Sequence, residues 1–199
     1  MRNAALGFRA HSGWAAMIAL AGPLDAPLVI GRWRIELAVG SAARAVQPYH
    51  TAALMPIDSA ETYLRSCRDA AAALAHKALR DVLAELSDYQ VRGACVLRAS
   101  GRPLPGLAGI LASHALIHTA EGEFYRAALR EACARCAVPE TGISERALLA
   151  EASHALGCSA EDLQSKVTGF GKVLGSPWRQ DEKLSTLAAW LVLARRTNP

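Results

Sequence analysis

The side chains best suited to chemistry lie close together in residues 113–126. His114, His118, Glu121 and Tyr125 recur there at intervals of three or four residues. A helix turns by about 100° per residue, so these side chains would fall within roughly 60° of one another, on one stripe. Apolar residues flank the stripe on the same half of the helix. We therefore expect the stripe to face the sheet or a neighbouring helix rather than open water.

This stripe has two interpretations. Two histidines four residues apart, followed by an acid, can bind a divalent metal or act as general acid and base toward a phosphate or an ester. The same groups can instead close the core as a His–Glu hydrogen-bond network, because an unsatisfied buried polar group costs about 1–3 kcal/mol. The zinc-protease pattern, with Glu directly after the first His, is absent from the sequence. A catalytic or metal site made of His114, His118 and Glu121 and a purely structural network both stay open.

The composition is that of one ordinary globular domain, which we expect to span residues 1–199. The chain is 52% hydrophobic and 20% charged, so it is long and apolar enough for one well-buried core. The formal net charge is +4 and the arginines are scattered, which permits contact with nucleic acid without requiring it.

The cysteines and the apolar segments indicate a cytoplasmic protein. All five cysteines lie in segments that we expect to be helix or core strand, which is typical of reduced thiols. No segment reaches the stretch of about eighteen uncharged apolar residues that a membrane span needs, so we expect no membrane contact.

The hydrophobic pattern predicts strands at the start of the chain and then helices that alternate with strands. Ser12-Gly13 is typical of a tight turn, Asp58 followed by Glu61 indicates the start of a helix, and residues 40–57 are expected to form a loop. We expect strands at 4–11, 14–20, 28–39, 91–99 and 141–144, and helices at 59–86, 107–137, 145–156, 159–174 and 180–195. The predicted order of elements along the chain is β-β-β-α-β-α-β-α, in which the three helices after the last strand are counted as one.

This order resembles that of the ribonuclease H-like superfamily. Within it, the segment Leu-Gly-Phe-Arg-Ala-His-Ser-Gly-Trp at residues 6–14 resembles the first strand and turn of the bacterial Holliday-junction resolvases. The acidic start of the last helix, residues 181–189, is similar to their C-terminal helix. The resemblance implies an α/β fold in three layers, with a mixed five-stranded sheet between helices on both faces.

The resemblance also implies a nuclease site that this chain has largely lost. Members of the superfamily hold two divalent metals with carboxylates from the first strand, the fourth strand and a late helix. Carried over, the first position falls on Arg9, the second on Leu97 or Arg98, and the last two on Glu182 and Ser185. A guanidinium cannot ligate Mg²⁺. We therefore expect Arg9 or Arg98 to pair with Glu182 in place of the metals, unless both arginines simply reach solvent.

Three functions fit these residues. The first is a catalytically degenerate domain that binds a protein partner, a second copy of itself, or nucleic acid through basic side chains: Arg9, Arg32, Arg34, Arg98 and Arg102. The second is a metal-dependent phosphoester hydrolase or nuclease whose site has moved to His114, His118 and Glu121, with Glu182 as a further candidate catalytic residue. The third is a structural component of a larger assembly, anchored by its tryptophans. Only the second would be an enzyme, and it would require a divalent metal as cofactor.

Overall fold

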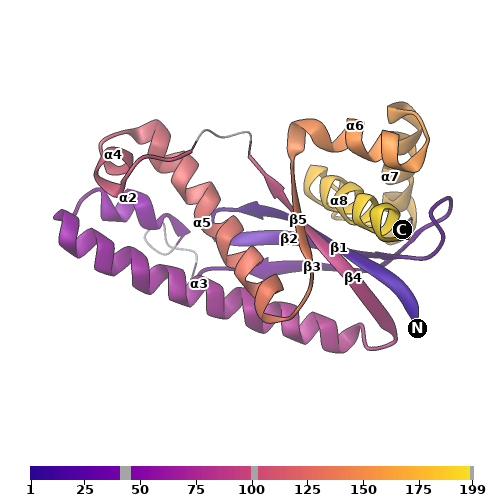
Figure 1. Cartoon of the computed structure of the whole chain (residues 1–199), viewed down its shortest axis with the longest axis horizontal. Helices are drawn as coiled ribbons and strands as arrows, with labels where there is room; N and C mark the ends of the chain where they lie inside the picture. The colour runs from indigo at the N-terminus through magenta and orange to yellow at the C-terminus, as the bar shows by residue number, and fades with distance from the viewer. Residues whose placement is uncertain (41–45, 100–102, 198–199) are drawn as a thin grey trace.

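The computed structural model in Figure 1 describes residues 1–40, 46–99 and 103–197. Five strands form one sheet: β1 (Arg2–His11), β2 (Trp14–Ala21), β3 (Leu28–Glu36), β4 (Tyr89–Arg98) and β5 (Glu140–Ser144). The helices are α2 (Pro48–Ala52), α3 (Ile57–Glu85), α4 (Leu107–Leu111), α5 (His114–Arg135), α6 (Glu145–Leu156), α7 (Ala160–Leu174) and α8 (Gln180–Thr197).

The sheet has the order β3-β2-β1-β4-β5. β1, β2 and β3 are antiparallel neighbours, whereas β4 and β5 run parallel to β1 and are reached through helices. His11 pairs with Trp14 across a tight turn in which Gly13 has a φ of +82°, a conformation that favours glycine. The mixed five-stranded sheet and the order predicted from the sequence are confirmed.

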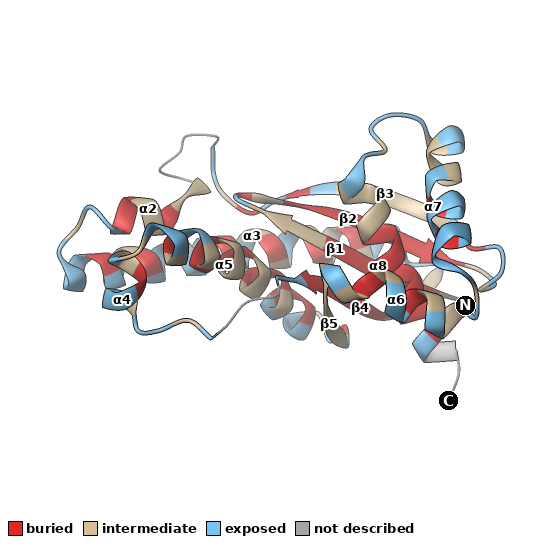
Figure 2. Ribbon diagram, turned by 90° about the horizontal axis from the view of Figure 1, so that it is seen from above, coloured by how far each residue is buried: buried red, intermediate tan, exposed pale blue. Residues whose placement is uncertain are grey.

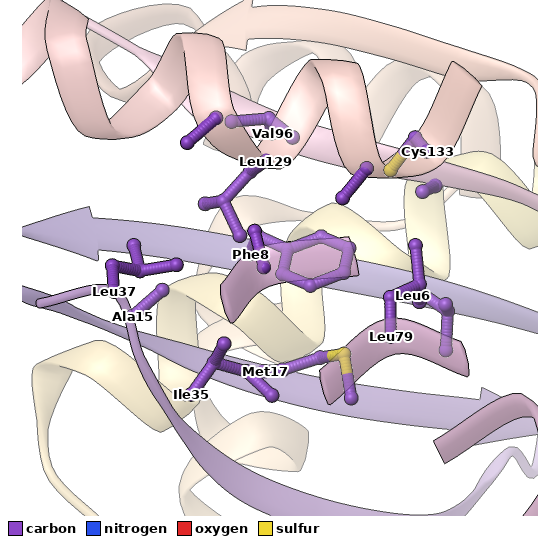
Figure 3. Packing of buried hydrophobic residues seen from close by; sticks show 14 of the residues in the cluster. Leu6, Phe8, Ala15, Met17, Ile35, Leu37, Leu79, Val96, Leu129 and Cys133 are labelled. Carbon is purple, nitrogen blue, oxygen red and sulfur yellow. The ribbon is translucent and has the colours of Figure 1, made fainter. Parts of the chain in front are cut away.

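Two hydrophobic cores lie on the two faces of the sheet. One contains Leu6, Phe8 and Met17 together with apolar side chains of α3 and α5 (Figure 3). The other contains Ala5 and Leu97 together with apolar side chains of α6, α7 and α8. Because successive strand residues point to opposite faces, Leu6 and Phe8 face α3 and α5, while alternate residues of β1 face α8. Figure 2 shows the resulting band of buried residues through the middle of the molecule.

α8 packs against β1 with the two backbones close together. A Cβ atom added to Gly7 would lie 1.9 Å from the backbone oxygen of Ser185. The Ser185 hydroxyl, which is fully buried, donates a hydrogen bond of 3.3 Å to the carbonyl oxygen of Ala16 on β2. This close packing brings the first turn of α8 beside the carboxyl end of β1.

Two predicted segments differ from the structure. The expected loop at 40–57 contains the short helix α2, and the expected helix at 107–137 is divided at Ala112 and Ser113 into α4 and α5. Ser113 has extended backbone angles (φ −134°, ψ 114°). The break lets apolar residues of both α4 and α5 pack around Tyr49 of α2. Tertiary packing thus overrides a sequence that contains no Gly or Pro at the break.

Within the described ranges, no helix combines the length and the apolar character that crossing a membrane requires. The five cysteines are free thiols, and burial raises the pKa of both Cys95 and Cys133 to about 12.

Candidate functional site

Arg9 lies near the end of β1 on the face covered by α8. Its Nε and Nη2 atoms each donate a hydrogen bond of 3.1 Å to one oxygen of Glu145, and Nη1 donates to Oδ1 of Asp181. Glu145 is the first residue of α6, directly after β5, and Asp181 lies in the first turn of α8. The Arg9 side chain is 22% exposed. One guanidinium therefore joins three elements at the carboxyl end of the central strands.

Asp181 also accepts a hydrogen bond from His11, whose Nε2 lies 2.8 Å from Oδ1. Burial by itself raises the pKa of the Asp181 carboxyl, but the hydrogen bonds from Arg9 and His11 outweigh it and hold this pKa below its ordinary value. Asp181 is therefore ionised at neutral pH. We call Arg9, His11, Glu145 and Asp181 the Arg9 cluster.

The expected pairing of Arg9 or Arg98 with Glu182 is wrong, because Asp181 takes that place. α8 begins at Gln180, so its phase turns Asp181 and Ser185, four residues apart, toward β1 and β2. Oε2 of Glu182 instead accepts a hydrogen bond of 2.7 Å from the backbone N–H of Arg179, just before the helix. This is the back-bonding half of a capping box, which gives Glu182 a structural role.

The fourth-strand position holds no carboxylate. Leu97 is 1% exposed and packs under α8, and its carbonyl oxygen accepts a hydrogen bond of 3.1 Å from Nε of Arg126 on α5. Arg98 is exposed and lies over Gly142 of β5, where an added Cβ would come 1.7 Å from its Nε. Alternation along β4 points Arg98 to the sheet face opposite to that of Leu97, so it does not join the Arg9 cluster.

A second group of side chains gathers where α2 meets the first turns of α5. His50, His114 and His118 each offer one ring nitrogen, and these atoms lie within 4.8 Å of one another. Nε2 of His114 and Nε2 of His118 are 3.0 Å apart, and the His50 ring is 4.7 Å from the His118 ring between centroids. We call these three residues the histidine cluster.

Glu121 lies behind the histidine cluster and is 2% exposed. Its Oε1 accepts hydrogen bonds from the backbone N–H groups of Tyr49 (2.8 Å) and His50 (3.1 Å) and lies 3.2 Å from Nδ1 of His50. One carboxylate thus satisfies amides in the first turn of α2 and orients a histidine ring. One turn later, the hydroxyl of Tyr125 donates to the carbonyl oxygen of Val46 at 3.0 Å.

The structure divides the predicted stripe of α5 into two parts. Glu121 and Tyr125 are buried, as expected, but His114 and His118 are exposed, which corrects the expectation that the whole stripe faces the interior. They lie in the first turns of α5, at the end that reaches past the sheet toward α2 and α4 (Figure 1). Nothing in the sequence connects His50 to this group, because α2 falls in a segment expected to be a loop.

Two solved structures of RuvC from Thermus thermophilus are similar to this chain over nearly its whole length. The first has a TM-score of 0.57 and 10% identity, and the match covers 98% of this chain and 96% of that one. The second, RuvC in complex with a Holliday junction substrate, also has a TM-score of 0.57 and 10% identity, with 96% and 94% coverage. No protein-family model and no curated protein matches the sequence.

The chain has a ribonuclease H-like fold of the RuvC kind. The expected fold class and the resemblance in layout are confirmed. At 10% identity, the similarity shows the fold only, and the chemistry of the site has to be inferred from the residues of this chain.

In this RuvC-like fold, a cavity of about 320 Å³ opens beside the Arg9 cluster. The Trp14 ring stacks on His11, with centroids 4.4 Å apart, and Cζ of Arg34 lies 3.9 Å from the centroid of Trp14. The lining residues are Trp14, Ala16, Arg32, Trp33, Arg34, Pro177, Arg179, Asp181 and Glu182. Basic and aromatic side chains therefore continue outward from the Arg9 cluster.

Among the predicted nucleic-acid-binding arginines that the structure describes, Arg32 and Arg34 line this cavity, whereas Arg9 and Arg98 do not. Arg9 is held in ion pairs, and Nη1 of Arg32 donates to carbonyl oxygens of Gly175 (3.1 Å) and Pro177. Arg34 lines the cavity with 56% of its side chain exposed and pairs with Glu36. Arg98 lies elsewhere, as described above, and Arg102 lies outside the described residues.

Proposed function

We propose that this chain is a catalytically degenerate RuvC-like domain that binds nucleic acid. It does not cleave nucleic acid at the end of the central strands, where members of the superfamily hold their metals. The observation that carries the proposal is the position of Arg9. A cation lies where the resemblance expects a carboxylate, and it occupies the two acids that reach the same end of the sheet, Glu145 and Asp181.

The side chains at this end do not fit a pair of divalent metals. Mg²⁺ requires oxygen ligands, yet the first-strand position supplies a guanidinium and the fourth-strand position supplies Leu97. Arg126 adds a second positive charge that acts on Glu145. A metal entering here would have to displace a bidentate Arg–carboxylate pair, which is among the stronger side-chain interactions.

The cavity beside the Arg9 cluster supports binding of nucleic acid. It offers exposed cations at Arg34 and Arg179, which can contact phosphates, while the Trp14 ring is covered by His11 and Arg34. One of the similar structures is that of RuvC with a Holliday junction substrate, which makes branched DNA the first ligand to test.

Binding is tested by fluorescence anisotropy with a four-way junction, a duplex and a single strand over a range of salt concentrations. We expect Kd to rise with salt, and the slope of log K against log salt to decrease by about 1 in Arg34→Ala and in Arg179→Ala. Arg80→Ala, which removes an exposed charge on α3, is the matched control and is expected to leave the slope nearly unchanged. Binding that is undetectable, or that is insensitive to these two arginines, contradicts the proposal and favours a protein partner.

The histidine cluster favours a second candidate function, hydrolysis of a phosphoester at a relocated site. Cleavage of the same substrates with Mg²⁺, Mn²⁺ or Zn²⁺ separates the two functions. We expect no cleavage by the wild type. Cleavage that is lost in His118→Ala but kept in Asp181→Asn would establish the relocated site, whereas cleavage lost in Asp181→Asn would show that the Arg9 cluster is catalytic after all.

A further inference from the structure

We infer that His50, His114 and His118 bind one divalent metal ion of the zinc class, at a site that shares no residue with the Arg9 cluster. Zinc prefers histidine nitrogens at about 2.0–2.1 Å in tetrahedral geometry, which places neighbouring ligand nitrogens about 3.4 Å apart. The Nε2 atoms of His114 and His118 are 3.0 Å apart, and all three ligand atoms lie within 4.8 Å of one another. Small side-chain rotations suffice to bring them around one ion.

The spacing of the ligands along the chain favours convergence. His114 and His118 are one helical turn apart on α5, so their side chains emerge on the same side. His50 approaches from α2, and its ring meets both of the others edge-to-face, at centroid distances of 5.4 Å and 4.7 Å. The ligand set is therefore a pair from one helix and a single residue from another element.

Glu121 has the position of a residue that orients a metal ligand. It bonds to Nδ1 of His50, which leaves Nε2 of that ring as the atom to bind the metal. A metal-binding histidine commonly uses its second ring nitrogen for a hydrogen bond to a carboxylate, which fixes the ring and makes it a better ligand. The sequence placed Glu121 among the ligands, whereas its geometry makes it a positioning residue and makes His50 the third ligand.

The framework around the site is held in place independently of the ion. Glu121 bonds to two amides of α2, and Tyr125 bonds to the carbonyl oxygen of Val46 just before it. The Tyr49 ring also packs edge-to-face on Phe124 of α5, 6.2 Å between centroids. These contacts hold α2 against α5, so the ion meets a largely formed site.

The exposure of the ligands defines the character of the site. His114 and His118 are exposed and His50 is 26% exposed, so an ion bound here keeps a position open to solvent. Three protein ligands with one open position are typical of zinc sites that bind water or an anion in the fourth place. The ligand class expected at that position is a small anion or a phosphate oxygen.

The experiment measures metal binding by the whole chain. Purified protein, freed of metal by a chelator, is titrated with Zn²⁺ in competition with a chromogenic chelator, and separately with Co²⁺, whose visible absorption is strong only in tetrahedral sites. We expect one equivalent per chain and a tetrahedral Co²⁺ spectrum. His118→Ala and His50→Ala should each weaken Zn²⁺ binding by at least 100-fold. Glu121→Gln, which keeps all three ligands, should weaken it by about 10- to 100-fold.

Matched controls separate this site from nonspecific binding and from the proposed function. His154→Ala removes an exposed histidine on α6 and should leave the Zn²⁺ affinity unchanged. Asp181→Asn changes the Arg9 cluster and should also leave it unchanged, whether or not nucleic acid binds there. Circular dichroism verifies that each variant is folded. If His118→Ala or His50→Ala does not fold, His114→Gln is measured in its place.

Several results would overturn the inference. Wild-type protein that retains well under one equivalent of Zn²⁺, or that gives only the weak spectrum of six-coordinate Co²⁺, would show that His114 and His118 are merely hydrogen-bonded to each other and His50 to Glu121. Affinity that is unchanged in a folded His118→Ala or His114→Gln variant would place any bound metal elsewhere.

Discussion

At the scale of single residues, Arg9 decides the chemistry at the end of the central strands. Its bidentate pair with Glu145 and its bond to Asp181 lie in a partly buried position, where all three side chains are 35% exposed or less. A partly buried ion pair of this kind contributes more to the stability of the fold than a surface ion pair does. Removing Arg9 would destabilise the fold mainly because two carboxylates would then lie close together without a cation.

We predict that Arg9→Met lowers the free energy of unfolding at pH 7 by about 2–3 kcal/mol, between the values typical of exposed and of fully buried pairs. The pKa of Asp181 lies below its ordinary value of 3.8 in the folded protein. A carboxyl with a lowered pKa stabilises the fold above about pH 4 and loses that contribution as the pH falls through its folded-state pKa. As the pH is lowered from about 5, the free energy of unfolding should therefore fall further for the wild type than for Arg9→Met.

Urea unfolding, followed by tryptophan fluorescence at a series of pH values, measures both effects. Lys77→Met, which breaks the exposed pair between Lys77 and Asp81, is the control and should change little. Parallel pH profiles of the wild type and Arg9→Met would contradict the assigned role of Arg9 in holding Asp181 ionised.

At the scale of elements, the phase of α8 and its distance from β1 determine which acid meets Arg9. Asp181 and Ser185 face the sheet because α8 starts at Gln180, and α8 comes close enough because Gly7 has no side chain. The position of α2 also depends on a contact between elements. Its backbone N–H groups bond to the Glu121 carboxylate of α5, and this contact places His50 beside His114 and His118.

We predict that Gly7→Ala destabilises the fold by about 3 kcal/mol, because its Cβ would meet backbone atoms of α8 that cannot rotate away. The matched control is Gly169→Ala in the interior of α7, where an added Cβ has no neighbour within 4 Å. That control should stabilise the protein by about 0.5–1 kcal/mol through its higher helix propensity. Thermal and urea unfolding compare the two, and a neutral Gly7→Ala would show that α8 packs less closely than described.

At the scale of the whole molecule, the sheet separates two cores. The histidine cluster lies outside the larger core, which is the one between the sheet and helices α3 and α5. α2 and α4 are short and lie at the end of the molecule away from α6 and α7 (Figure 1). Their stability depends on packing against α3 and α5 rather than on their own length, since helices of one or two turns are marginal in water.

We predict that amide hydrogen exchange is slowest in β1, β4 and α8, where exchange requires global unfolding, and much faster in α2 and α4. Exchange measured by NMR or mass spectrometry in metal-free protein tests this directly. Equal protection of α2 and α8 would mean that the α2 end is an integral part of the cooperative core.

The sequence by itself determined the order and the type of the main elements, because hydrophobic periodicity and turn residues act locally. Its resemblance to the ribonuclease H-like superfamily also implied that the carboxylates expected there are replaced, at Arg9 and at Leu97 or Arg98. Only the tertiary structure decided the partners. Arg9 and Asp181 are 172 positions apart, and His50 and Glu121 are 71 apart. Their meeting depends on the phase of α8 and on the path of the chain around α2, which are set by packing across the whole fold and leave no local signal in the sequence.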